Sequence, residues 1–417
     1  MKKRVIFTIV TKNYIGLAYV LRDSIRRHTP DVDFRVVVAD EVSGYDVQSD
    51  GDILIAKDVL SYSGQEWTEM AFKYNLTEFC TAIKPAAFQY LFGLGYDEVM
   101  YFDPDIYTFS SLLPLFERLS RSVMLLTPHV VGIHPHYGGQ QEEWTFNANG
   151  IFNLGFCAMR KSADSDKILD WWRSKLFDNA FTDRSVGNFT DQKWMDWAPA
   201  LLGEKLDVVR DLGVNVAPWN YFEREILQEG TRLTVRFREE SENSQASYPL
   251  VFVHYSGYDY RQLLEGRIHH ARIDVMRYSD IQLLHHTYTD VLVANKQQFL
   301  QYIALPYSYA TYSDGSLIDG FHRRLYHGML LKGVRVNDPF SVKGDFYPLL
   351  RKRGLLSKQN TDKFTPANLP GIEDKKAKLN RFYRILFSLI GYKRYPLFLK
   401  SLYMYCRPEN HTFLIKK

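Results

Sequence analysis

The chain has few cysteines and no long apolar run, and both features limit what it can be. Its three cysteines, Cys80, Cys157 and Cys406, are far apart and show no C-x-x-C spacing. This pattern argues against a disulfide framework and a cysteine-based zinc site, and it indicates a reducing compartment. The apolar segment 5–10 is too short for a signal peptide. Because no segment approaches the roughly 18 uncharged apolar residues of a membrane span, we expect an intracellular, cytoplasmic protein.

Aromatic residues and a basic C-terminus are what the chain has in excess. Aromatic residues make up 15% of its 417 residues, and the formal net charge is +4. That charge is uneven, because residues 375–417 carry +10 and residues 1–374 carry −6. A block of like charge at a terminus typically serves an interaction. The remaining composition is that of a folded globular chain.

Hydrophobic periodicity predicts an α/β fold in the N-terminal part. Residues 5–10 and 34–39 have the pattern of buried strands, and residues 17–25 between them repeat apolar side chains at helical spacing. A strand, a helix and a strand in this order predict a parallel pair joined by a crossover helix. The further predicted elements are a helix from Pro85, strands at 98–102, 123–126, 151–159 and 250–254, and helices at 164–175 and 191–201.

Composition divides the chain into three predicted parts. We expect a catalytic α/β domain over residues 1–275 and a helical extension over 276–345. Residues 346–417 are predicted to form a linker and a basic-aromatic tail, because residues 350–374 are rich in Lys, Pro, Gly and Asn.

Asp103-Pro-Asp105 directly follows the predicted strand 98–102. In open α/β sheets, ligands bind at the carboxyl ends of the strands. Two carboxylates one residue apart can bind one hard divalent cation and leave its other positions for phosphate oxygens. A surface turn is the alternative, since Asp and Pro are also common turn residues.

Four further short motifs accompany this pair in a fixed order. They are Thr8-Ile-Val-Thr-Lys-Asn13-Tyr14, Asn153-Leu-Gly155, Asp191-Gln192 and His254-Tyr-Ser-Gly257. The ordered set resembles the family 8 type retaining glycosyltransferases of bacterial surface-polysaccharide synthesis, over about residues 1–260. The resemblance implies a GT-A fold, which is a Rossmann-like nucleotide-diphospho-sugar transferase domain with a mixed central sheet, here followed by a helical C-terminal extension.

The resemblance also implies a metal site and a donor site. Asp103, Asp105 and His254 match the metal ligands of the family, and this mixed oxygen and nitrogen set suits Mn²⁺ or Mg²⁺. The metal neutralises the diphosphate leaving group. Gln192 and Asp191 match the catalytic positions, where Gln192 stabilises oxocarbenium-like charge. The residues that match donor-binding positions are Thr8, Asn13, Tyr14, Lys84, Asn153, Gly257 and Arg261, with Lys84 at a usual arginine and Arg261 in place of a phosphate-binding lysine.

Each of these positions also has a purely structural interpretation. Asp191 and Gln192 are typical of a helix N-cap and first turn, and Asn153 of a strand boundary. His254 follows an apolar strand and is equally typical of a core histidine. Residues 138–144 are interpreted either as an ordinary loop or as a lid on the acceptor side, and residues 314–326 as a turn followed by an amphipathic helix.

The tail predicts an interfacial helix. Leu379, Phe382, Leu386 and Leu389 fall on one helical stripe, and basic side chains lie off it. A helix of this kind associates with an anionic membrane surface. Packing on the acidic remainder of the chain is the alternative, and nucleic acid binding is not expected, because the pattern is not that of a stacking groove.

Together these features predict a metal-dependent glycosyltransferase. It would move a hexose, galactose or glucose, from a UDP-hexose donor to a lipid-linked, lipopolysaccharide or capsular glycan acceptor, with retention of the anomeric configuration. It would work as a peripheral protein on the cytoplasmic face of the inner membrane. Two alternatives remain open, namely a non-catalytic subunit that binds a sugar nucleotide or a glycan, and a sugar nucleotidylyltransferase.

Overall fold

The computed structural model describes residues 2–45, 47, 51–238, 246–270, 272–356 and 372–415. They form two compact units, the first comprising residues 1–62 and 76–307 and the second residues 63–75 and 308–417. The helices α11 (Gln282–Ala294) and α12 (Lys296–Ile303) belong to the first unit. The predicted division into a catalytic domain, a helical extension and a tail stays a prediction, and residues 357–371 of the predicted linker lie outside the described residues.

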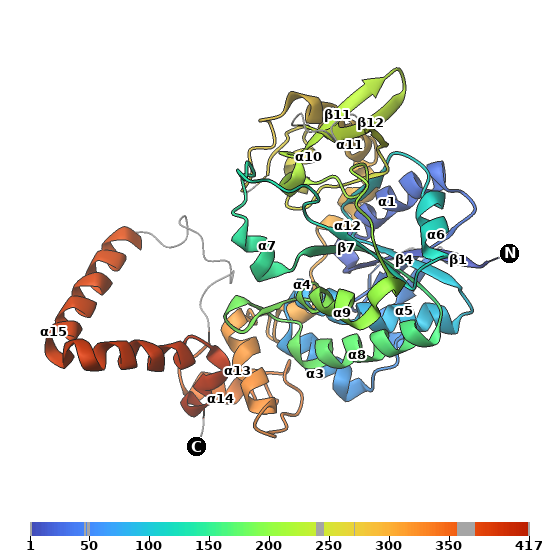
Figure 1. The fold of residues 1–417 in the computed structure, drawn as a ribbon. Helices are drawn as coiled ribbons and strands as arrows, with labels where there is room; N and C mark the ends of the chain where they lie inside the picture. The colour runs from blue at the N-terminus through green and yellow to red at the C-terminus, as the bar shows by residue number, and fades with distance from the viewer. Residues whose placement is uncertain are drawn as a thin grey trace. The chain divides into compact units, whose positions relative to one another are not determined.

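A seven-stranded mixed sheet forms the centre of the first unit (Figure 1). Strand β7 is antiparallel to β4 and β6, whereas the other neighbouring strands are parallel. The strand order is β10 (Leu206–Val208), β6 (Met124–Pro128), β7 (Phe152–Arg160), β4 (Glu98–Phe102), β1 (Arg4–Val10), β2 (Asp33–Val38) and β3 (Ile53–Ile55). The predicted α/β class with a mixed central sheet is therefore confirmed.

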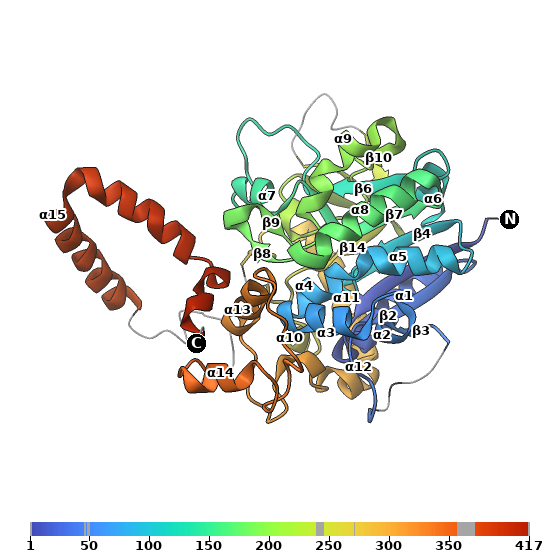
Figure 2. The same cartoon turned by 90° about the horizontal axis from the view of Figure 1, so that it is seen from below.

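Helices cover both faces of this sheet. Helices α5 (Lys84–Gly93) and α8 (Ala163–Asn179) lie on one face, and α1 (Ile15–His28) and α6 (Leu113–Leu119) lie on the other (Figures 1 and 2). All five residues of β4 and eight of the nine residues of β7 are buried. Strands covered on both faces read as nearly continuous apolar runs, which is why they could be located from the sequence.

Shorter elements surround the central layers of the first unit. Strand β5 (Ile106–Thr108) pairs with β14 (Phe252–His254) outside the main sheet. The other small strands are β8 (Thr182–Asp183), β9 (Asn188–Phe189), β11 (Arg224–Glu229), β12 (Arg232–Phe237) and β13 (Tyr248–Pro249). The remaining α-helices of this unit are α2 (Ala56–Val59), α4 (Leu76–Ala82), α7 (Trp144–Asn149), α9 (Ala198–Leu202) and α10 (Tyr260–Leu263).

The helix predicted near 191–201 changes from a 3-10 to an α-helix in the structure. A 3-10 helix, η3 (Lys193–Trp197), precedes α9, and Gln192 is the residue before η3. Pro199 lies in the first turn of α9. A proline lacks the backbone N–H that would continue an α-helix from the preceding turn, so the second helix begins there. The predicted helix is therefore present over residues 193–202, as a 3-10 helix that continues into an α-helix.

The second unit is helical. It contains α3 (Gly64–Lys73), α13 (Gly320–Leu330), α14 (Tyr347–Lys352), α15 (Ile372–Tyr405) and the 3-10 helix η8 (Pro408–Leu414). Its apolar cluster includes Phe72, Tyr326 and Phe346. The guanidinium of Arg323 donates to the carbonyl oxygens of Phe72 and Tyr74, at the end of α3. The predicted helical C-terminal region is confirmed.

Helix α15 carries the basic-aromatic tail. Its backbone breaks at Gly391, where φ is +71°, so it consists of two helical arms. Many of its apolar side chains are exposed, including Phe382 at 54% and Leu389 at 77%. Among the described residues, no helix is both long enough and apolar enough to cross a membrane.

Candidate functional site

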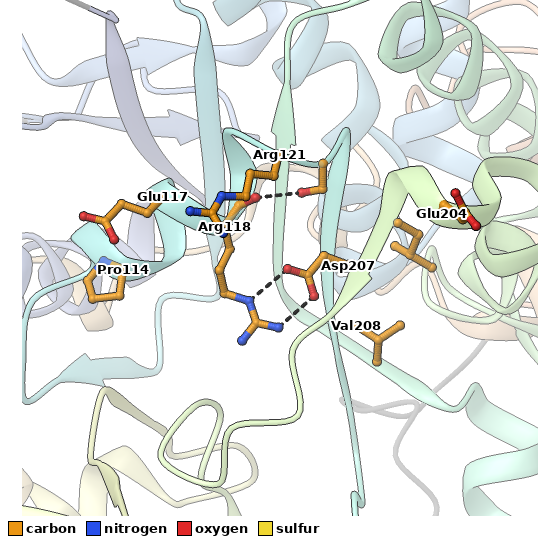
Figure 3. Close-up of a pocket in the computed structure, with 9 residues that line it drawn as sticks. Pro114, Glu117, Arg118, Arg121, Glu204, Asp207 and Val208 are labelled. Atoms are coloured by element: carbon orange, nitrogen blue, oxygen red, sulfur yellow. Dashed lines mark hydrogen bonds and ion pairs between the residues drawn. The ribbon is translucent and has the colours of Figure 1, made fainter.

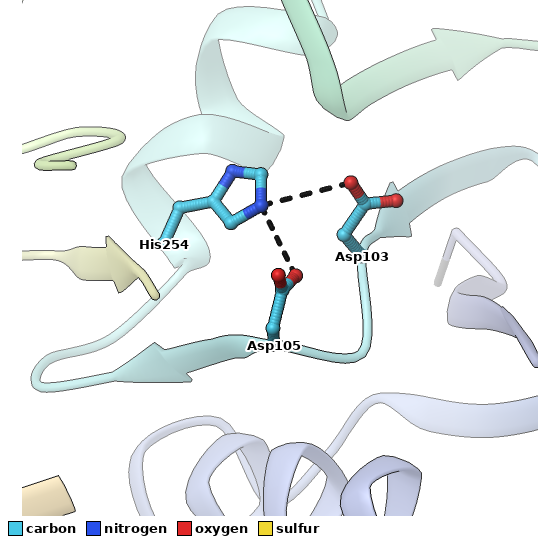
Figure 4. Close-up of side chains that lie close together, drawn as sticks. All are labelled: Asp103, Asp105 and His254. Atoms are coloured by element: carbon cyan, nitrogen blue, oxygen red, sulfur yellow. Dashed lines mark ion pairs between the residues drawn. The ribbon is translucent and has the colours of Figure 1, made fainter. Parts of the chain in front are cut away.

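Two chain segments bring Asp103, Asp105 and His254 together (Figure 4). Asp103 follows the last residue of β4, and Asp105 precedes β5. The antiparallel register pairs His254 with Ile106, and the N–H of Tyr255 donates to the carbonyl oxygen of Asp105. This pairing places the imidazole beside both carboxylates, although His254 lies 149 positions after Asp105 in the sequence.

The three side chains present their polar atoms to one small volume. One ligand atom from each residue lies within 4.8 Å of the others. His254 Nε2 lies 3.0 Å from Asp105 Oδ1 and 3.6 Å from Asp103 Oδ2. The Tyr101 hydroxyl donates to the other oxygen of Asp103 at 2.5 Å. That bond leaves Asp103 Oδ2 to face the histidine.

The closeness of the two carboxylates shifts the pKa values of His254 and Asp103. Burial by itself lowers the pKa of His254, but the carboxylates of Asp105 and Asp103 outweigh it and raise the pKa above its usual value. Enclosure within the protein raises the pKa of Asp103, the charge of Lys84 opposes this, and Asp105 adds to it. Both shifts favour the protonated forms of His254 and Asp103, because two carboxylates lie close together here. A bound cation would balance the same negative charge.

The residues present fit a divalent cation. Asp105 Oδ1 is buried and has no hydrogen-bond partner of normal geometry among the described residues, although His254 Nε2 lies 3.0 Å away. Asp105 Oδ1, His254 Nε2 and an oxygen of Asp103 thus lie close enough together to share one cation. Two carboxylates and an imidazole form a ligand set that suits Mn²⁺ or Mg²⁺.

Lys84 and Asp191 form a buried ion pair beside this group. Their side chains are 1% and 3% exposed, and Lys84 Nζ lies 2.5 Å from Asp191 Oδ2. Lys84 Nζ also donates to the carbonyl oxygen of Leu154. Burial lowers the pKa of Lys84, but Asp191 and Asp103 outweigh this effect and raise it. The lysine is thus charged and held in place by partners that were not evident from its position in the sequence.

Asn153 and Gln192 form a hydrogen-bonded group on the other side of His254. Gln192 Oε1 accepts from the N–H of Leu154 at 3.2 Å and from Asn153 Nδ2 at 3.5 Å. Gln192 Nε2 donates to the carbonyl oxygen of Asn149. Asn153 Oδ1 lies 3.1 Å from His254 Nδ1. The two amide side chains are therefore held in defined orientations.

A cavity of about 730 Å³ opens onto these residues. Its volume is in the range of pockets that hold small-molecule ligands. The predicted site residues that line it are Lys84, Asp103, Asn153, Asp191, Gln192, His254 and Gly257. Aromatic and basic side chains also line it, among them His129, Trp144, Arg184, Trp219 and Arg272.

The remaining predicted residues do not line this cavity, namely Thr8, Asn13, Tyr14, Asp105 and Arg261. Thr8 is fully buried within β1, and its Oγ1 has no hydrogen-bond partner among the described residues. Asn13 accepts a hydrogen bond from Thr11. Burial raises the pKa of Tyr14, Asp105 raises it further, and Arg261 opposes this, which places the phenol among these charges. Nucleotide binding by these residues stays a prediction.

Several residues at the site were not anticipated. Tyr101 lies two positions before Asp103, so the alternation of a strand could have indicated that both face the same way. Trp219 contacts His254 edge to face, with ring centroids 5.3 Å apart. Burial lowers the pKa of His129 to about 4, so this cavity-lining imidazole is neutral. Asn215 donates to Asn153 Oδ1 at 3.1 Å. No sequence signal pointed to Asn215, His129 or Trp219.

A second hollow of about 750 Å³ lies between α6 and β10 (Figure 3). One of its two arginines, Arg118, is already neutralised, because the guanidinium pairs with Asp207 at 2.7 Å and with Asp211 at 3.0 Å. It contains none of the predicted site residues. We therefore assign the functional site to the cavity beside His254.

Comparison with known proteins gives distant likenesses. No family model matches the chain. It is 23% identical over 218 residues to the uncharacterized protein YfnF of Bacillus subtilis strain 168, which covers 52% of this chain and 67% of that protein. The galactosyltransferase LgtC, solved with donor and acceptor sugar analogs, shares 17% identity over 61% of this chain and 87% of its own, with a TM-score of 0.35. The apo-form glycosyltransferase GlyE of Streptococcus pneumoniae TIGR4 shares 13% identity over 75% and 67%, with a TM-score of 0.36.

Proposed function

We propose that the chain is a metal-dependent glycosyltransferase of the GT-A type. The observation that carries this proposal is the convergence of Asp103, Asp105 and His254 beside a cavity, which Asp103 and His254 line together with Lys84 and Gln192. A cation site open to a cavity of this size suits a ligand with a diphosphate and a sugar. The five ordered sequence motifs agree with the same reaction.

Asp103, Asp105 and His254 would hold the metal, Mn²⁺ or Mg²⁺. When bound, the metal acts as a Lewis acid that neutralises the diphosphate leaving group. Tyr101 contributes by fixing one oxygen of Asp103 through its hydroxyl. Trp219 packs on the His254 ring and limits access of water to it.

The donor sugar lies, in this proposal, beside Asn153, Asp191 and Gln192. Asp191 is held by the ion pair with Lys84, and Gln192 is anchored to the backbone at Leu154 and Asn149. Side chains held this firmly can present dipoles to charge that develops at the anomeric carbon without reorganising during the reaction. We assign Gln192 to stabilise that charge and Asp191 to position the sugar.

The donor is a UDP-hexose, with galactose or glucose as the sugar, and the product retains the anomeric configuration. Retention then requires attack from the face of the leaving group, with the leaving phosphate assisting. The acceptor is a lipid-linked, lipopolysaccharide or capsular glycan. Trp144 and Trp219 line the cavity and offer aromatic surfaces on which a sugar ring can stack.

Helix α15 would bring this reaction to a membrane surface. Arg381 and Arg384 are exposed on the helix, together with the apolar side chains of Phe382 and Ile385. Basic residues near an anionic leaflet contribute about 1 kcal/mol each, and the apolar side chains enter the interface. The protein is then peripheral on the cytoplasmic face of the inner membrane.

Donor hydrolysis and transfer test the proposal. Purified protein is incubated with UDP-galactose or UDP-glucose and Mn²⁺, released UDP is measured, and the anomeric configuration of a transferred sugar is read by NMR. We expect Asp105→Asn to lower turnover on the order of 100-fold or more, because it removes a charged ligand without changing size. Asp211→Asn, at a carboxylate paired with Arg118 outside the cavity, is the matched control and leaves turnover unchanged.

The same assay separates the alternatives. Wild-type turnover in Asp105→Asn would contradict the assigned metal site. Pyrophosphate release from UTP and a sugar phosphate would indicate a nucleotidylyltransferase. Donor binding with neither hydrolysis nor transfer, at any Mn²⁺ concentration, would indicate a non-catalytic binding subunit.

A further inference from the structure

The imidazole of His254 is held by a chain of hydrogen bonds that begins at the backbone. The N–H of Leu154 can only donate, and it donates to Gln192 Oε1. The carbonyl oxygen of Asn149 can only accept, and it accepts from Gln192 Nε2. These two backbone groups fix which end of the Gln192 amide is oxygen and which is nitrogen.

That orientation is passed on to Asn153. Because Gln192 Oε1 is an acceptor, the atom of Asn153 that faces it at 3.5 Å is the donor Nδ2. Asn153 Oδ1 therefore points the other way, toward His254 Nδ1 at 3.1 Å. An amide oxygen only accepts, so Nδ1 carries a proton, and Nε2 presents its lone pair to a cation held by Asp103 and Asp105.

Asn215 provides the second donor to Asn153 Oδ1. Its Nδ2 lies 3.1 Å from that oxygen and 2.8 Å from Thr127 Oγ1. The side chain is 1% exposed. If Asn153 rotated so that its Nδ2 faced Asn215, two donors would meet in a buried place, so Asn215 disfavours the reversed amide.

Backbone contacts of Asn215 and of the residue after it fix the position of Asn215 relative to His254. Its φ is +60°, a left-handed conformation that asparagine adopts more readily than most residues. The next residue, Val216, pairs with Val253, and its carbonyl oxygen accepts from the N–H of His254 at 2.8 Å. The Asn220 side chain donates to the carbonyl oxygen of Asn215 at 3.0 Å.

We propose that Asn215 is a positioning residue of the metal site, acting through Asn153 to keep the proton on Nδ1 of His254 and Nε2 free to bind the cation. This inference rests on the proposed function, because it concerns the same metal site. It also gives Asn153 a role besides contact with the donor sugar. Partners of this kind, which orient a metal-binding histidine through its second nitrogen, strongly affect metal affinity.

Mn²⁺ affinity, measured by electron paramagnetic resonance of free Mn²⁺ with no donor present, tests the proposal. Asn215→Gly keeps the left-handed backbone and removes the donor, and we expect the Kd for Mn²⁺ to rise about tenfold or more. Asn153→Asp supplies a carboxylate that accepts from His254 in either rotation. Asn153→Asp should therefore lower the Kd for Mn²⁺ by a larger factor in the Asn215→Gly background than in the wild-type background.

The double-variant comparison removes the trivial effect of added charge, since that effect is present in both backgrounds. Thermal unfolding is measured in parallel, because a merely structural role would lower Tm and leave the Kd unchanged. A Kd for Asn215→Gly within twofold of wild type, or additive effects of the two substitutions, would overturn the proposal.

Asn215→Asp is a second variant of equal size in case the glycine variant does not fold. Its negative charge alone would tighten Mn²⁺ binding, whereas loss of the donor to Asn153 weakens it, so a weaker Kd despite the charge supports the proposal, and additive effects of Asn215→Asp and Asn153→Asp overturn it. Wild-type protein that binds no Mn²⁺ would overturn the metal site of the proposed function itself. A normal wild-type Kd that Asn215→Gly does not change overturns only the role of Asn215.

Discussion

The ion pair between Lys84 and Asp191 combines a structural role with a proposed functional one. Both side chains are almost completely buried, with Nζ and Oδ2 2.5 Å apart. Removing one partner leaves an unpaired buried charge, which costs about 3–5 kcal/mol. We expect Lys84→Met to lower the free energy of unfolding by this amount in urea denaturation, and Lys84→Met with Asp191→Leu to regain most of it.

Turnover then separates the two roles. If Asp191 positions the donor sugar, the double variant is stable but inactive. If the pair serves only the fold, the double variant hydrolyses UDP-hexose at the wild-type rate, and the assignment of Asp191 to the donor site fails. A Lys84→Met protein as stable as wild type would show that the ion pair contributes nothing to the fold.

His285 predicts a pH dependence of stability. Burial lowers its pKa to about 4, and the neighbouring His286 adds to this effect, whereas a histidine in the unfolded chain has a pKa near 6.5. Between these values the unfolded state binds more protons, so stability falls as the pH drops from about 6.5 to 4. From pH 7 to pH 5 this residue accounts for a loss of about 2 kcal/mol.

His285→Gln is the matched variant, because glutamine keeps a polar side chain near the Tyr258 hydroxyl, which lies 2.6 Å from His285 Nε2. Unfolding is followed in urea at pH 7 and at pH 5. The variant should lose less stability than wild type between the two pH values. An equal loss in both proteins would show that His285 is not the group that titrates.

The metal triad and its support differ in how well they could be predicted. Asp103 and Asp105 follow a wholly buried strand, and His254 ends another, so a resemblance in motif order was enough to propose them. Asn215 follows no such strand and lies far from each motif in sequence. It reaches the site only because the residue after it pairs with Val253, which is a tertiary contact that no local pattern reports.

At the level of elements, β7 must come unusually close to β14. A Cβ on Gly155 would lie 2.3 Å from His254 Cε1 and 2.7 Å from Nδ1. We expect Gly155→Ala to displace the imidazole, to weaken Mn²⁺ binding and to lower the free energy of unfolding by about 1–3 kcal/mol. Isothermal titration with Mn²⁺ and urea denaturation measure the two effects.

Gly93→Ala is the matched control, because a Cβ at this position in α5 meets nothing within 4 Å. It should leave Mn²⁺ binding unchanged and stabilise the helix slightly. Normal Mn²⁺ binding by a folded Gly155→Ala protein would contradict the close approach of β7 to the histidine.

Element length decided which parts of the fold could be predicted. Strands β1, β4 and β7 are long or fully buried, and their apolar runs stand out in the sequence. Strands β3 and β10 each have three residues and are only partly buried, which is too short to show a period of two. They form because neighbouring strands already present free backbone groups to them.

At the scale of the whole molecule, the uneven charge predicts binding to anionic vesicles. Arg381→Glu with Arg384→Glu should weaken vesicle binding on the order of 30-fold or more, because each cation contributes about 1 kcal/mol. Co-sedimentation with vesicles that contain or lack anionic lipid measures this, and added salt should weaken binding of the wild type. The control is Lys167→Glu with Arg232→Glu, at exposed basic residues of the first unit.

Substitutions are preferable to truncation in this experiment. Glu409 and Thr412 in η8 are buried at 4% and 2% exposure, and η8 packs against α13. A deletion from residue 375 would remove that packing together with α15. Equal sedimentation of the charge-reversed and wild-type proteins would contradict membrane association through α15, and no sedimentation of either would favour packing of the tail on the protein itself.

The central claim is that the cavity beside His254 binds a nucleotide diphosphate through a metal. Thermal unfolding of the full chain with UDP, GDP, ADP or TDP, each with and without Mn²⁺, tests it most directly, since a ligand that binds the folded state raises Tm. We expect a rise in Tm with UDP that requires Mn²⁺ and that is lost in Asp105→Asn. No rise with any of the four nucleotides, or an equal rise without Mn²⁺, would contradict it.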